Sequence, residues 1–170
     1  MKEQISPKKQ IEDSKTIIKM VLNLPEVDNV TKYKVIDLML WNITGAYGKL
    51  NTKFVSEGAI TSKDEKLQHE HVFTKKYLIN RILNEPDNLD SIFELAFACI
   101  VTEKEHHKLS NVKDVEGWSR YVNAGIKVFA LDDDIVYRRL LELKKREFLK
   151  LNFSEREKIL LVKPAILFVE

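Results

Sequence analysis

Two stretches decide how this chain folds: LQHEHV at residues 67–72 and ACIVTEKEH at residues 98–106. The first is typical of a short strand, and the apolar run over 97–101 is the best strand candidate in the chain. Thr102 and Glu105 form the T-x-x-E pattern of a capping box, which predicts that a helix begins directly after the second strand. The order strand, intervening segment, strand and helix is a ββα arrangement.

Helices are expected on both sides of this element. Ser6 followed by Pro7 is typical of a helix start, and Pro25 marks the end of that helix. Apolar residues at helical spacing and a second capping box predict further helices at about residues 30–43, 74–84, 115–124 and 132–150, and a short one from Ser154. The chain is therefore expected to be mainly α with a small β element.

The polar, irregular segment over 49–66 is the best candidate for a boundary within the chain. We expect an N-terminal helical segment over 1–66, the ββα element with its surroundings over 67–130, and a C-terminal basic helix and tail over 131–170. No internal repeat or low-complexity tract separates these parts, which are expected to form one compact domain.

The composition limits the classes of function. With 170 residues, of which 44% are hydrophobic and 32% charged, the chain is typical of a globular protein. Its 28 Lys and Arg against 26 Asp and Glu exclude a globally basic coat protein for nucleic acid, but leave room for a local basic face. The single cysteine, Cys99, excludes an intrachain disulfide and a cysteine-rich zinc site, and its apolar neighbours predict a small buried residue.

The first residues contain no secretory signal pattern, because charged residues interrupt every apolar stretch. No run approaches the roughly 18 apolar residues of a membrane span. We therefore expect a cytoplasmic protein without a membrane partner.

All four histidines lie between residues 69 and 107. His69 and His71 flank Glu70 at the end of the first strand, and His106 and His107 lie on the helix after the second strand. Imidazole together with carboxylate suits Mn, Ni, Co or Zn, and Mg²⁺ tolerates the carboxylate best. The competing interpretation is a set of surface or capping histidines without a common function.

These stretches resemble the HNH endonucleases, also called the ββα-metal or His-Me finger family. Members carry an acidic residue directly before a histidine at the end of the first strand, and a second histidine on the following helix, often within T-x-x-E-H-x-x-L. EH at 70–71 and TEKEHHKL at 102–109 fit this form. The resemblance covers residues 69–109, about a quarter of the chain, and implies a ββα-metal core flanked by helices.

The resemblance implies a role for each matching residue. His71 resembles the general base, while Glu70 and His106 resemble ligands of one divalent metal ion, with Mg, Mn, Zn and Ni all admitted. A neutral imidazole takes a proton from water near working pH, and a divalent cation stabilises the charge that develops on phosphate oxygens. Asn88 is the best-placed match for the central asparagine of the family, and Asn84 is the second.

His69 remains an alternative metal ligand. In a regular strand Glu70 and His71 point to opposite faces, whereas His69 and His71 share one face. Glu70 and His71 reach one site only if the strand ends or twists there. His107 points about 100° away from His106 on the helix and is expected in solvent.

A basic helix is predicted after the core. Three aspartates at 132–134 complement the dipole at its start, and six basic residues against two acidic ones follow from residue 138 on. We expect Arg138, Arg139 and Lys145 to contact phosphates of nucleic acid. Arg120, on an earlier helix, is a further candidate for such a contact.

The expected function is a metal-dependent HNH-type endonuclease that hydrolyses phosphodiester bonds in DNA, and its expected partners are DNA and a second copy of the chain in a homodimer. The alternative is a non-catalytic module on a decayed HNH scaffold, which binds nucleic acid or protein. Thr74 in place of a proline common in the family, and the lack of a clear asparagine, favour this alternative. A third hypothesis is a helical interaction protein whose histidines are incidental.

Overall fold

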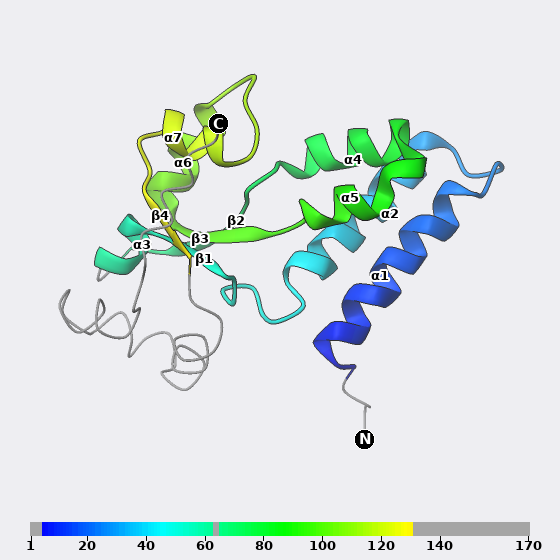
Figure 1. Ribbon diagram of the computed structural model, residues 1–170, viewed down its shortest axis with the longest axis horizontal. Coiled ribbons are helices and arrows are strands. Elements are labelled where there is room, and N and C mark those ends of the chain that lie inside the picture. Colours follow the sequence, from blue (N-terminus) through cyan, green and yellow to red (C-terminus); the bar gives the residue numbers. More distant parts are fainter. Residues whose placement is uncertain (1–4, 63–64, 131–170) are drawn as a thin grey trace. The chain divides into compact units, whose positions relative to one another are not determined.

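The computed structural model describes residues 5–62 and 65–130 (Figure 1). They belong to two compact units. The helical unit contains residues up to Lys49 together with Phe73–Phe97, and the sheet unit contains Leu50–Val72 and the chain from Ala98 on. The chain thus leaves the sheet unit after its first histidine-bearing stretch and returns to it for the second.

The helical unit contains four α-helices and one 3₁₀ turn among the described residues. Their bounds are α1 (Pro7–Leu22), α2 (Asn29–Thr44), α4 (Lys75–Asn84), the 3₁₀ turn η1 (Pro86–Asn88) and α5 (Leu89–Glu94). Side-chain oxygens of Ser6, Asp28 and Thr74 accept hydrogen bonds from backbone N–H groups in the first turns of α1, α2 and α4. The helices predicted over 30–43 and 74–84, and the one starting at Pro7, are therefore confirmed.

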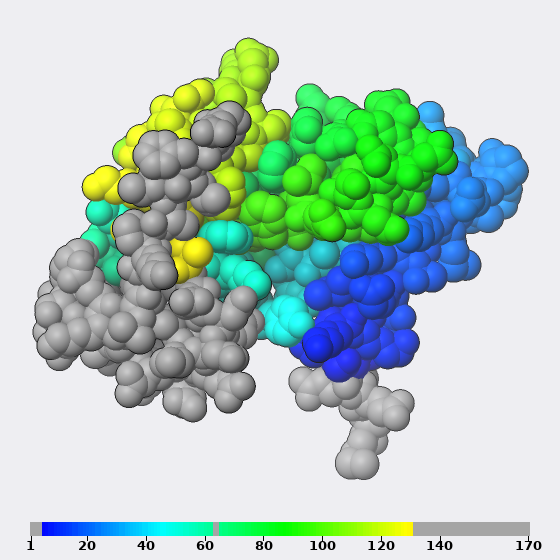
Figure 2. Space-filling view, viewed as in Figure 1, coloured from blue at the N-terminus to red at the C-terminus, as the bar shows by residue number. Residues whose placement is uncertain are grey.

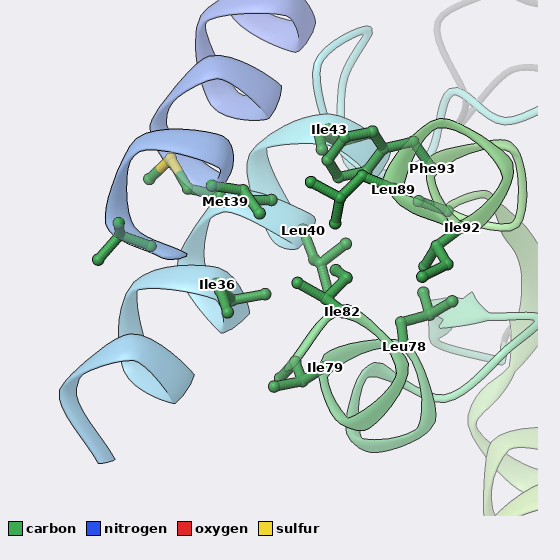
Figure 3. Close-up of a cluster of buried hydrophobic side chains, with 13 residues drawn as sticks. Ile36, Met39, Leu40, Ile43, Leu78, Ile79, Ile82, Leu89, Ile92 and Phe93 are labelled. Carbon is green, nitrogen blue, oxygen red and sulfur yellow. The ribbon is translucent and has the colours of Figure 1, made fainter. Parts of the chain in front are cut away.

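The helical unit has an apolar core of its own (Figure 3). Its buried members come from all four helices and the residues after α5: Ile18, Val21, Ile36, Met39, Leu40, Ile43, Leu78, Ile79, Ile82, Leu89, Ile92, Phe93 and Ala96. Those of α2 recur at the three- and four-residue spacing of one helical face. In the space-filling view, side chains of 73–97 lie directly against α1 (Figure 2), and Lys19 pairs with Asp90 at 2.9 Å. Segments far apart in sequence thus form one body.

The sheet unit is built on four short strands in the order β2-β3-β1-β4. Their bounds are β1 (Phe54–Ser56), β2 (Leu67–His71), β3 (Ala98–Thr102) and β4 (Val128–Ala130). β2 and β4 run antiparallel to their neighbours, and β1 runs parallel to β3. Three helices complete this unit in the described residues: α3 (Glu57–Thr61), α6 (Glu103–Asn111) and α7 (Trp118–Asn123). A chain that is mainly α with a small β element is therefore confirmed.

The strands β2 and β3 and the helix α6 have the strand, strand, helix order predicted from sequence. β2 pairs antiparallel with β3, with Glu70 opposite Cys99, and α6 contacts both strands. The capping box is present, since Thr102 Oγ1 accepts from Glu105 N at 3.2 Å and Glu105 Oε2 accepts from Thr102 N at 2.9 Å. These reciprocal bonds start α6 at the last residue of β3.

Some features differ from the sequence prediction. The segment over 49–66, expected to be irregular, contains β1 and α3. Each is too short to show a periodic pattern, and β1 depends on pairing with the distant strands β3 and β4. The division into units also differs from the predicted one. The helical unit ends at Lys49, before the predicted boundary at residue 66, and it also includes residues 73–97. The basic helix predicted over 132–150 and the short helix from Ser154 lie outside the described residues.

A membrane-crossing helix would have to be both long and strongly apolar. No helix within residues 5–62 and 65–130 meets both conditions.

The core of the helical unit can be tested with two leucines of α2. Leu40 is fully buried in the cluster, whereas Leu38 on the same helix is 56% exposed. Leu40→Ala should cost about 2–5 kcal/mol, because it removes buried methyl groups and leaves a cavity. Leu38→Ala should change the free energy of unfolding by no more than about 0.5 kcal/mol. Urea denaturation followed by circular dichroism measures both, and equal losses would contradict the packing.

Candidate functional site

The site is built on the last residues of β2. Successive side chains of a strand point to opposite faces of its sheet, so Glu70 faces one side and His69 and His71 face the other. All three are nearly buried, with exposed fractions of 7%, 7% and 8% in that order. The strand therefore places a carboxylate on one face of the sheet and two imidazoles on the other face.

The Glu70 carboxylate is shared between a histidine and an arginine. Its Oε2 lies 2.6 Å from Nδ1 of His106 on α6, and its Oε1 accepts a hydrogen bond from Nη2 of Arg120 on α7 at 2.9 Å. The exposed fraction of the side chain is 10% for Glu70, 4% for Arg120 and 41% for His106. The group is thus a buried ion pair whose histidine reaches the surface.

Arg120 also holds the backbone around this carboxylate. Its Nη1 donates to the carbonyl oxygens of His71 and Val72 at 3.0 and 3.3 Å, and its Nη2 donates to the carbonyl of Leu109 at 3.4 Å. One guanidinium therefore joins the end of β2, the last turn of α6 and the helix α7.

The position of Arg120 corrects the expectation that this residue reaches a phosphate. Its side chain is enclosed, and its donors are directed at Glu70 and at backbone carbonyls inside the sheet unit. The sequence around Arg120 gives no signal for this burial, because its apolar neighbours Trp118 and Tyr121 are two and one residues away and do not share its face of a helix.

His69 and His71 form a pair on the other face of β2. Their ring centroids are 5.2 Å apart in an edge-to-face arrangement. The strand keeps its regular pairing with β3 through His71, so the twist that would turn His71 toward Glu70 does not occur within β2. The structure brings Glu70 and His106 together, while the candidate base and the alternative ligand His69 face away from them.

The other candidate residues lie elsewhere. Asn88 belongs to the helical unit, where its side-chain amide donates to Glu85 Oε2 at 3.4 Å. His107 is exposed, as expected, with its ring 5.9 Å from that of His106. The candidate phosphate contacts Arg138, Arg139 and Lys145 are outside the described residues, so their placement stays a prediction.

The capacity of the site for metal rests on two donor atoms. Among the described residues, no group of three His, Cys, Asp or Glu side chains could hold a metal ion. Glu70 Oε2 on the strand and His106 Nδ1 on the helix nevertheless lie in direct contact, 2.6 Å apart. A hard ion such as Mg²⁺ commonly takes one or two carboxylates and completes its shell with water and phosphate oxygens. A divalent ion bound here would replace the direct contact between Oε2 and Nδ1, with this carboxylate and this imidazole as its protein ligands.

Two further ionisable groups of the sheet unit, the Cys99 thiol and the Tyr121 hydroxyl, are buried. Burial, helped by the negative charge of Glu105, raises the pKa of the Cys99 thiol well above its usual range. Burial also raises the pKa of the Tyr121 hydroxyl, with smaller contributions from Cys99 and Glu70. Cys99 is fully buried, so the predicted role as a small core residue is confirmed.

The chain was compared with known proteins at three levels. No family model matches it, and neither the curated proteins nor the solved structures contain a match. The functional argument therefore depends on the residues and contacts of the chain itself.

The buried ion pair leads to a prediction for stability. Arg120→Ala should destabilise the sheet unit by about 3–5 kcal/mol, because it leaves the Glu70 carboxylate buried without its counter-charge. In a Glu70→Gln background the same change should cost less, since an uncharged amide remains. Lys127→Ala, at an exposed pair with Glu57, should change stability by less than about 0.5 kcal/mol. Chemical denaturation measures all four variants, and a cost for Arg120→Ala that is the same in both backgrounds would contradict the pairing.

Proposed function

We propose that the sheet unit is the ββα-metal core of an HNH-type endonuclease that hydrolyses phosphodiester bonds in DNA. The observation that carries the proposal is the contact between Glu70 and His106. These residues are 36 positions apart in the sequence, yet Nδ1 and Oε2 lie 2.6 Å from each other. They are the two residues that the family resemblance assigns to the metal ion.

The surrounding elements support the proposal. The pair stands on an antiparallel strand pair followed by a helix, which is the element order of the family core. The intervening segment is not a long irregular loop, because it contains α4 and α5 and packs into the helical unit. The interval between the two half-motifs is therefore filled by folded structure and does not separate the strands.

The chain's own residues would act as follows. Glu70 Oε2 and His106 Nδ1 would hold one divalent ion, and that ion would stabilise the charge that develops on the phosphate oxygens. Arg120 keeps Glu70 in place through the other carboxylate oxygen. His71, the last residue of β2, is the base that the family resemblance implies, but its side chain lies on the face of β2 opposite Glu70, so it reaches water at this ion only if the end of the strand turns.

The geometry also favours a second candidate function, a binding module without catalysis on the same scaffold. Arg120 already neutralises Glu70, and the described residues offer no third ligand. Thr74, which stands where the family often has proline, caps α4 by accepting from Tyr77 N at 3.2 Å. In this alternative the Glu70, His106 and Arg120 group only stabilises the sheet unit, and DNA or protein is bound without cleavage.

A plasmid-nicking assay separates the two functions. The wild-type protein should nick DNA with Mn²⁺ or Mg²⁺ and stop when EDTA is added. Glu70→Gln and His106→Ala should each lower the rate by about 100-fold or more, because a metal ion contributes several kcal/mol to the transition state. His107→Ala, the exposed neighbour on α6, should keep the wild-type rate. Retained DNA binding without nicking in any divalent ion would instead establish the binding module.

The role of His71 requires its own measurement. If the end of β2 turns so that His71 acts as the base, His71→Ala should lower the cleavage rate by about 10²–10⁴-fold, while DNA affinity and Mn²⁺ affinity stay close to wild type. His69→Ala is the matched control on the same face of β2. A larger loss of Mn²⁺ affinity in His69→Ala would assign the ligand role to His69, and full activity in a folded His71→Ala protein would remove His71 from the mechanism.

A further inference from the structure

The Glu105 carboxylate makes more contacts than its capping box requires. Besides Thr102 N, its Oε2 accepts hydrogen bonds from Ser56 Oγ at 2.5 Å and Thr102 Oγ1 at 3.2 Å. Its Oε1 accepts from the backbone N–H of Gly58 at 3.2 Å. Ser56 and Gly58 belong to a segment nearly 50 residues earlier in the chain, so this carboxylate joins distant parts of the sheet unit.

The same carboxylate closes the first turns of two helices. At α6 it satisfies the N–H of the cap residue Thr102, and at α3 it satisfies the N–H of Gly58. Ser56 connects the two, since its hydroxyl donates to Glu105 and accepts from Ala59 N at 3.0 Å. The first turn of a helix leaves its N–H groups unpaired, so a carboxylate placed there satisfies donors at both helices.

The approach of Glu105 to α3 depends on a glycine. A Cβ atom at position 58 would lie 2.6 Å from Cδ and 2.8 Å from Oε2 of Glu105. Such distances are far inside van der Waals contact, so any larger residue would push the carboxylate away. The backbone of α3 therefore lies against Glu105 without an intervening side chain.

These contacts bear on His106, the next residue of α6. The ring of His106 reaches Glu70 only if the first turn of α6 keeps its position over β2 and β3. The last turn of α6 is held separately, where Arg120 binds the carbonyl of Leu109. The first turn is held through Glu105, which ties it to the end of β1 and the start of α3.

We infer that Glu105 is a positioning residue for the Glu70 and His106 pair. By bonding Ser56 and Gly58, it fixes the first turn of α6 and with it the point at which His106 Nδ1 meets Glu70 Oε2. The part of this inference that concerns metal binding by the pair rests on the proposed function. The contact between His106 and Glu70 can be measured without metal, so the inference can also be tested by itself.

The test compares Glu105→Gln with Glu103→Gln in the full chain. Both variants remove one negative charge from the first turn of α6, but Glu103 bonds Lys66 and Gln68 and does not hold α3. In Glu105→Gln a side-chain NH₂ replaces one acceptor and faces N–H donors, so at least one link is lost. We expect the ring ¹⁵N signals of His106 in the metal-free protein to shift in Glu105→Gln and to stay at the wild-type position in Glu103→Gln.

Titration with Mn²⁺ supplies the second readout. Glu105 bonds neither ligand directly, so Glu105→Gln should lower the Mn²⁺ affinity by no more than the about 10- to 100-fold typical of a lost bond to a ligand, and Glu103→Gln should leave it unchanged. If wild type itself binds no Mn²⁺, the proposed function fails, and the ¹⁵N signals still decide the positioning role.

A folded Glu105→Gln protein with wild-type His106 signals would overturn the inference. If this variant does not fold, Ser56→Ala replaces it, because it removes one link to β1 and α3 while the bonds between Thr102 and Glu105 remain. Wild-type His106 signals in Ser56→Ala would then overturn the inference, and a shift would support it.

Discussion

The buried carboxylate of Glu70 is the constraint on which the rest of the sheet unit depends. A carboxylate taken out of water needs a counter-charge and hydrogen-bond donors, or it destabilises the fold. Arg120 supplies both at 2.9 Å, and the ring of His106 contacts the other carboxylate oxygen at 2.6 Å. Because these partners come from α7 and α6, satisfying one side chain of β2 also brings both helices to this edge of the sheet.

This arrangement couples stability to the proposed chemistry. Arg120 uses one oxygen of Glu70 and three backbone carbonyls, whereas the other oxygen meets His106, which is partly exposed. An ion at this place would interact with Oε2 and Nδ1 while the guanidinium keeps the carboxylate fixed. The contacts of Glu70 with Arg120 and His106 would persist in a protein that has lost catalysis. The endonuclease and the binding module therefore share one structure, and they differ in metal binding and in cleavage.

The two histidine-bearing stretches can lie together because the segment between them folds elsewhere. Residues 73–97 contain α4 and α5, whose buried side chains join those of α1 and α2 in a separate core. β2 and β3 are then paired as though joined by a short turn, with five residue pairs in register from Leu67 opposite Thr102 to His71 opposite Ala98. The strand, strand, helix core is assembled from discontinuous sequence without loss of its register.

What the sequence determined by itself is the local structure. Ser6, Asp28 and Thr74 cap helices through residues three positions away, and the Thr102 to Glu105 box starts α6 by the same short-range rule. The apolar strand β3 and the burial of Cys99 follow from neighbouring residues as well. The resemblance to a known family added the expectation that Glu70 and His106 share a site.

Only the tertiary structure decided where the polar groups of the sheet unit find their partners. The pairing of β1 with β3, the inward direction of Arg120 and the link from Glu105 to Ser56 all join residues 45 to 50 positions apart, at which spacing no sequence pattern operates. The side chains of Glu70 and His71 point to opposite faces of the sheet because β2 stays regularly paired with β3 up to its last residue. Desolvation is the physical reason: a buried charge or N–H group must be paired, and the nearest partner in space is set by the packing of the whole unit.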